Sequence, residues 1–141
     1  GGEAVIYYGY ARLTGDVDFF IDTSRKNALN LYEALKEFWR GDVPGIEGCE
    51  ALMEPGVIFQ FGVPPNRIDI ITHVDGVTFR KAWHGRATTS MEIRGEQVSI
   101  YFIGLEELIA NKTAINRPKD QEDLKYLVKA KEKSDPHGSG K

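Results

Sequence analysis

The run Thr-Gly-Asp-Val-Asp-Phe-Phe-Ile at residues 14–21 places two aspartates, Asp16 and Asp18, at the start of an apolar stretch. The apolar and aromatic residues predict a strand over residues 17–21. Alternate strand residues face the same side, so both carboxylates lie on one face, roughly 6.6 Å apart along the backbone. Two such charges repel each other, and a divalent cation commonly neutralises them. The run therefore predicts a strand with a metal site at its acidic end.

A third carboxylate occurs in a second apolar run. Asp69 lies between two isoleucines in a predicted strand over residues 67–72, and a buried aspartate is costly unless it is paired or binds metal. If the two strands are neighbours, Asp69 joins Asp16 and Asp18. Three carboxylates around two Mg²⁺ ions match the two-metal arrangement for phosphoryl and nucleotidyl transfer. In the alternative interpretation, the first two aspartates end a strand at a solvated turn and Asp69 pairs with Arg67 or another cation.

The remaining sequence predicts an α+β fold, with a small mixed, partly antiparallel sheet and packed helices. Periodicity and turn residues separate the elements. Besides residues 17–21, four strands are predicted, and they pair as two hairpins. The first hairpin joins residues 57–61 to residues 67–72, and the second joins residues 88–93 to residues 97–103. Residues 3–10 are predicted to form a short helix or turn, and helices are predicted over residues 25–40 and 77–83 and twice after residue 105. Pro118 suits the first turn of the last helix, where its missing N–H costs nothing.

Composition narrows the class of protein. The chain has 141 residues, of which 41% are hydrophobic, as suits one domain. Its net charge of −3 argues against a generally basic nucleic-acid-binding surface, though it allows a local patch. The single cysteine excludes an internal disulfide framework and favours the cytoplasm. No run of eighteen apolar residues occurs, so no membrane segment is expected.

A glycine pair, Gly1 and Gly2, precedes the aspartates, with thirteen residues between Gly2 and Asp16. Glycines let the backbone approach a triphosphate closely, and N–H groups at a helix start favour anions. A glycine pair, a short helix and two aspartates split by a hydrophobic residue resemble the signature of the polymerase-β-like nucleotidyltransferase superfamily. The spacing is the longest that this signature allows.

Four longer segments resemble, in the right order, the small bacterial nucleotidyltransferases related to the AbiEii toxin group. They are G-Y-A-R-L-T-G-D-V-D-F-F-I-D, G-V-P-P-N-R-I-D-I-I-T, D-G-V-T-F-R-K-A-W and L-I-A-N-K-T-A-I-N-R-P-K-D-Q-E-D-L. The resemblance covers about residues 1–130. We expect a nucleotidyltransferase core over residues 1–103, a helical segment over residues 104–133 packed on it, and a disordered tail over residues 134–141.

The resemblance also implies roles for individual residues. Asp16 and Asp18 bind metal, Asp69 is the third catalytic and metal-binding carboxylate, and Gly1 and Gly2 contact the nucleotide phosphates. The further predicted nucleotide contacts are Arg12, Thr14, Lys112 and Lys119. Alternatively, Arg12 and Thr14 lie in a surface turn. For Lys112 and Lys119, the alternative is a solvated helix face with weak ion pairs. Asp120 and Asp123 are a further alternative, as the groups that position these cations.

The predicted activity is Mg²⁺-dependent nucleotidyl transfer. A nucleoside monophosphate moves from an NTP to an acceptor hydroxyl, and pyrophosphate leaves. The acceptor is a tRNA 3′ end, a protein hydroxyl or a small molecule, and the relatives suggest a toxin–antitoxin role with an antitoxin partner. The alternative is a non-catalytic nucleotide-binding or regulatory module that retains the fold. A missing carboxylate or a lost glycine pair would favour that module, and the sequence keeps both.

Overall fold

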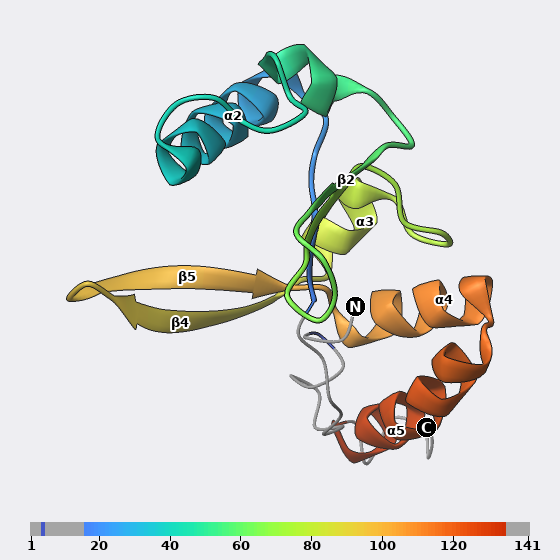
Figure 1. Cartoon of the computed structure of the whole chain (residues 1–141). Coiled ribbons are helices and arrows are strands. Elements are labelled where there is room, and N and C mark those ends of the chain that lie inside the picture. The colour runs from blue at the N-terminus through green and yellow to red at the C-terminus, as the bar shows by residue number, and fades with distance from the viewer. Residues whose placement is uncertain (1–3, 5–15, 135–141) are drawn as a thin grey trace. The chain divides into compact units, whose positions relative to one another are not determined.

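Figure 1 shows the computed structural model of the chain, in which residue 4 and residues 16–134 are described. The described residues fall into two compact units, residues 16–74 and residues 75–134 with Ala4. Both units combine helices with a small sheet, which confirms the α+β class. The predicted helix or turn over residues 3–10, apart from Ala4, and the predicted tail beyond Ser134 lie outside the described residues. The predicted boundary at residue 103 stays a prediction.

The first unit is built on a three-stranded mixed sheet. Its strands, in spatial order, are β1 (Val17–Phe20), β3 (Ile68–Ile71) and β2 (Ile58–Phe61). Strand β2 runs antiparallel to β3, as the predicted hairpin requires, whereas β1 runs parallel to β3. The two strands that carry the aspartates are therefore neighbours.

Helix α2 (Arg25–Trp39) follows β1 and matches its predicted range to within one residue. The hydroxyl of Ser24 accepts a hydrogen bond from the backbone N–H of Asn27 at 3.4 Å, which satisfies one of the unpaired donors at the helix start. The helix ends where Arg40 adopts a left-handed conformation, with φ of 55°. That residue's N–H bonds back to a carbonyl of the last turn.

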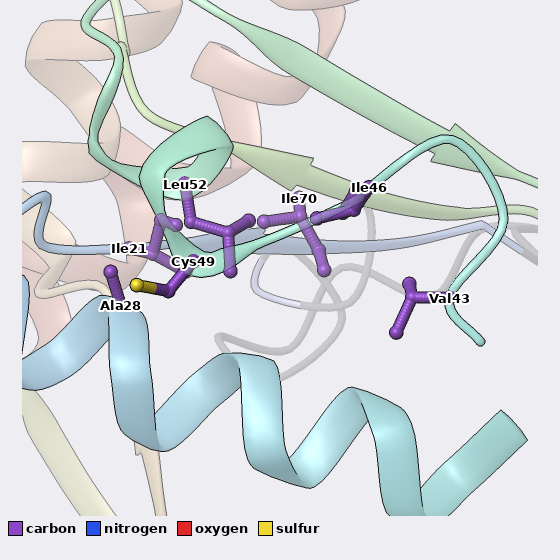
Figure 2. Packing of buried hydrophobic residues seen from close by; sticks show 7 residues of the cluster. All are labelled: Ile21, Ala28, Val43, Ile46, Cys49, Leu52 and Ile70. Atoms are coloured by element: carbon purple, nitrogen blue, oxygen red, sulfur yellow. The ribbon is translucent and has the colours of Figure 1, made fainter. Parts of the chain in front are cut away.

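The core of the first unit lies between α2 and one face of the sheet. Figure 2 shows its buried side chains, which are Ile21, Ala28, Val43, Ile46, Cys49, Leu52 and Ile70. The loop after α2 contributes to this core through a short 3-10 helix, η1 (Cys49–Met53), that sequence periodicity did not predict. Phe19, on the edge strand β1, is 53% exposed.

The second unit contains a β-hairpin and three helices within its described residues. In chain order these are α3 (Phe79–His84), β4 (Ala87–Ile93), β5 (Glu96–Phe102), α4 (Leu105–Ile115) and α5 (Pro118–Ser134). The two strands, drawn as long paired arrows in Figure 1, are antiparallel and confirm the second predicted hairpin. Arg94 and Gly95 link them at φ of 50° and 80°, the positive values that a two-residue hairpin turn requires.

Helices α4 and α5 pack together around Leu108, Leu127 and Ala4. Between them, Asn116 turns the chain with φ of 57°, and Pro118 is the first residue of α5, as predicted. Among the described helices, none combines the length and apolar character needed to cross a membrane.

Candidate active site

Polar side chains form a row on the sheet face opposite α2. The strand register pairs Asp18 with Asp69 and Asp69 with Gln60, so the row crosses all three strands. Ile70 packs in the core, and because side chains alternate along a strand, its neighbour Asp69 faces the other way. Asp16 precedes Asp18 by two residues and so shares its face. Sequence reasoning missed Gln60, since its place in the row depends on the register of β2 against β3.

Arg67 lies among these carboxylates, two residues before Asp69 on the same face. Its Nε and Nη2 donate to the two oxygens of Asp69 at 2.8 and 3.1 Å, a bidentate ion pair. Its backbone N–H donates to Asp16 Oδ1 at 3.2 Å, and its Nη2 lies 3.8 Å from Asp16 Oδ2. The hydrogen bond with Asp69, followed by the nearby negative charges, raises the pKa of Arg67. The guanidinium therefore supplies a permanent cation to the carboxylates.

The donor chemistry of this face suits Mg²⁺, which prefers carboxylate oxygens. Asp16, Asp18 and Asp69 offer such oxygens from two adjacent strands. However, within residue 4 and residues 16–134, no three acidic, histidine or cysteine side chains are gathered closely enough to hold a metal ion. Because Arg67 engages both oxygens of Asp69, the three carboxylates could bind a metal together only after Arg67 releases Asp69. Their role as metal ligands stays a prediction.

The predicted nucleotide contacts are placed less directly. Gly1, Gly2, Arg12 and Thr14 lie outside the described residues. Lys112 and Lys119 belong to the second unit, on α4 and α5. Lys119 is exposed, whereas Lys112 is only 3% exposed. The interpretation of a solvated helix face is therefore wrong for Lys112, because this residue is turned into the packing between the two helices.

Lys112 belongs to a buried ion cluster with Asp120 and Asp123, and the exposed Arg117 pairs with Asp120 from its edge. The Nζ atom of Lys112 lies 3.3 Å from Asp120 Oδ1 and 3.2 Å from Asp123 Oδ2. Arg117 donates to Asp120 Oδ2 from its Nε at 2.6 Å and from its backbone N–H at 3.0 Å. Asp120 is the third residue of α5, so the backbone bond also caps the helix start. The cluster joins α4 to α5, and a phosphate contact by Lys112 stays a prediction.

Asp120 makes the stability of the second unit sensitive to acid. Burial would raise its pKa, but the hydrogen bonds from Arg117 and the charge of Lys112 outweigh burial and lower the pKa from 3.8 to about 2. A carboxyl group whose pKa is lower in the folded state stabilises the protein at pH values above its unfolded-state pKa. This stabilisation should be complete above pH 3.8 and disappear as the pH falls toward 2. Wild type and Asp120→Asn can be compared by chemical denaturation across this pH window. The difference between their free energies of unfolding should shrink as the pH falls. A constant difference would contradict the assignment.

A small α+β unit with aspartates on two adjacent strands is the arrangement expected of a minimal nucleotidyltransferase. The chain matches, over residues 1–130, the profile of a family described as nucleotidyltransferase of unknown function (DUF6036). The chain belongs to this family, and the nucleotidyltransferase class predicted from the sequence is confirmed. No curated protein and no solved structure shows significant similarity to the chain. The match adds no support for a particular closeness to the AbiEii group.

Proposed function

We propose that the protein is a Mg²⁺-dependent nucleotidyltransferase that moves a nucleoside monophosphate from an NTP to an acceptor hydroxyl. The observation that carries this proposal is the register of Asp18 beside Asp69 on neighbouring strands, with Asp16 on the same face. The family match supports the class of reaction. The metal, the nucleotide and the acceptor are our inference. A toxin–antitoxin role and an antitoxin partner rest on the sequence resemblance alone and stay predictions.

The carboxylates and Arg67 would share the work of the reaction. Asp16, Asp18 and Asp69 would hold Mg²⁺, which when bound neutralises triphosphate charge and lowers the pKa of the attacking hydroxyl. Asp69, once released by Arg67, presents a carboxylate oxygen that can accept the hydroxyl proton. The acceptor oxygen then bonds to the α-phosphorus, and the bond to the β-phosphate oxygen breaks to release pyrophosphate. The freed guanidinium is suited to bidentate contact with phosphate oxygens.

A thermal-shift experiment with Mg²⁺ and each NTP tests this function. A ligand at 100 times its Kd adds about 2.7 kcal/mol of stability, so a matching Mg²⁺–NTP pair should raise the melting temperature by several degrees. Arg67→Gln removes the cation that pairs with both Asp69 and Asp16. This variant should melt below wild type in EDTA and gain more than wild type from Mg²⁺ alone.

Arg25→Gln is the matched control, since Arg25 is an exposed cation at the start of α2 in the same unit. It should respond to Mg²⁺ as wild type does. The proposed function fails if neither wild type nor Arg67→Gln is stabilised by Mg²⁺ together with any one of the four NTPs.

A further inference from the structure

Aromatic and basic side chains gather where α3 meets the β4–β5 hairpin in the second unit. The rings of Trp83 and Tyr101 lie 4.9 Å apart between centroids at 67°, and Phe79 stacks 6.1 Å from Trp83. The guanidinium carbon of Arg86 lies 3.9 Å from the Trp83 ring centroid and 5.3 Å from that of Tyr101. We call these four residues the Trp83 patch.

The Trp83 patch holds its rings in place yet leaves them accessible. Arg86 Nη1 donates to the backbone carbonyl of Trp83 at 2.6 Å, which fixes the guanidinium against the indole. Trp83 is nevertheless 43% exposed and Tyr101 is 49% exposed. Exposed aromatic side chains beside a guanidinium are the elements on which proteins stack unpaired nucleobases. Internal packing accounts for the contacts among these residues but leaves their exposed surface without a role.

The charge around the Trp83 patch is positive although the chain as a whole is acidic. Helix α3 carries the exposed cations Arg80 and Lys81, and Arg86 follows the helix after Gly85. The carboxylate of Glu107 lies against Gly85 and offsets part of this charge. The balance remains cationic, which complements a phosphate backbone. This is the local basic patch that the net charge of the sequence allows.

One face of the hairpin extends the Trp83 patch with polar groups. The register pairs Tyr101 with Thr88, Ser90 with Ser99, and Glu92 with Gln97 on the same face, and all six residues are exposed. Hydroxyl and amide groups can both donate and accept hydrogen bonds, as base edges and sugars require. The opposite face is mostly apolar, with exposed Met91, Ile93 and Val98.

We propose that the Trp83 patch and the polar hairpin face bind single-stranded nucleic acid. An unpaired base stacks on the exposed rings, while Arg86 and the cations of α3 hold phosphates. A base within a duplex has no free face to offer, so single strands are preferred. Because this inference makes nucleic acid the class of acceptor, it rests in that respect on the proposed function. The binding itself requires neither NTP nor metal.

Fluorescence anisotropy with labelled 12-nucleotide strands tests the inference. Single-stranded RNA, single-stranded DNA and an RNA duplex are compared at low salt in EDTA, with the full chain and no NTP. At least one of the two single strands should bind more tightly than the duplex. Trp83→Ala should weaken binding by about 5- to 150-fold, the effect of losing one stacked base. Arg80→Gln/Lys81→Gln should reduce the slope of log K against log salt by about 1.4, since each lost phosphate contact contributes about 0.7.

Two controls keep the test specific. Tyr126→Ala removes another exposed aromatic residue, 42% exposed with Lys129 at 5.9 Å from its ring, and should bind as wild type does. Asp42→Asn, which removes an exposed carboxylate of the other unit, should also bind normally. The arginine–lysine variant changes only exposed side chains, so it serves if Trp83→Ala fails to fold. A preference for RNA over DNA would assign the hairpin hydroxyls to the ribose, and equal binding would assign them to bases and phosphates.

The inference is overturned if neither single strand binds, if the duplex binds equally well, or if the folded patch variants keep wild-type affinity and salt dependence. Failure of binding with nucleotidyl transfer intact would reject nucleic acid as the acceptor and leave the proposed function standing. Binding without any nucleotidyl transfer would reject the proposed function and leave the nucleic-acid-binding site standing.

Discussion

Replacing Asp69 with asparagine is expected to lower nucleotidyl transfer by at least about a thousandfold while the protein stays folded. Losing one preorganised electrostatic group commonly costs 10²- to 10³-fold, and Asp69 would serve as both metal ligand and proton acceptor. The amide is nearly the same size and keeps one acceptor oxygen for Arg67. Transfer of label from an α-labelled NTP measures the effect, and circular dichroism reports the fold.

Asp42→Asn is the matched control, because Asp42 is an exposed carboxylate in the same unit. It should retain full transfer. From the sequence alone, relief of charge repulsion would leave the fold of Asp69→Asn intact or even stabilised. The bidentate pair with Arg67 argues against a gain in stability, since the variant loses a charge-assisted interaction. Comparable transfer by Asp69→Asn and wild type would remove Asp69 from the mechanism.

The second large effect is expected at the buried ion cluster. Asp120→Ala should destabilise the protein by about 3–5 kcal/mol, the usual cost of breaking a buried ion pair by removing one partner. Lys112 would then be left buried with one carboxylate, and the capping bond to the Arg117 N–H would be lost. Urea denaturation followed by circular dichroism measures the change.

A comparison on the same helix separates this effect from ordinary surface pairing. Glu122 pairs with Lys125 at 3.2 Å on the exposed side of α5. Glu122→Ala should therefore change stability by less than about 0.5 kcal/mol. In a double-mutant cycle, Lys112→Met and Asp120→Ala should cost less together than the sum of their separate effects. Strict additivity would show that the two side chains are not coupled.

Much of the fold was predictable because its signals are local. Short runs of β-branched and aromatic residues marked β2 and β3, and the Arg-Gly turn marked the β4–β5 hairpin. Pro118 fixed the start of α5 because proline is tolerated in the first turn of a helix. Helix η1 was missed because five residues are too few to show helical periodicity.

The candidate site was predictable in its residues but not in its contacts. The spacing of Asp16 and Asp18 placed both on one face before the structure was considered. The pairing of β1 with β3 joins segments about fifty residues apart, and the sequence gives only a conditional reason to expect it. Arg67 illustrates the limit, because the sequence offered it as a cation for Asp69 without indicating its contacts to Asp16.

The identity of the transferred group tests the central claim most directly. Wild-type protein with Mg²⁺ and a cell extract as acceptor source would receive an NTP labelled at either the α- or the γ-phosphate. The account predicts that only the α-label becomes attached to an acceptor, that labelled pyrophosphate appears from the γ-labelled NTP, and that Asp69→Asn does neither. Acceptors labelled from the γ-phosphate, or attachment of the α-label that survives Asp69→Asn, would contradict nucleotidyl transfer at these carboxylates.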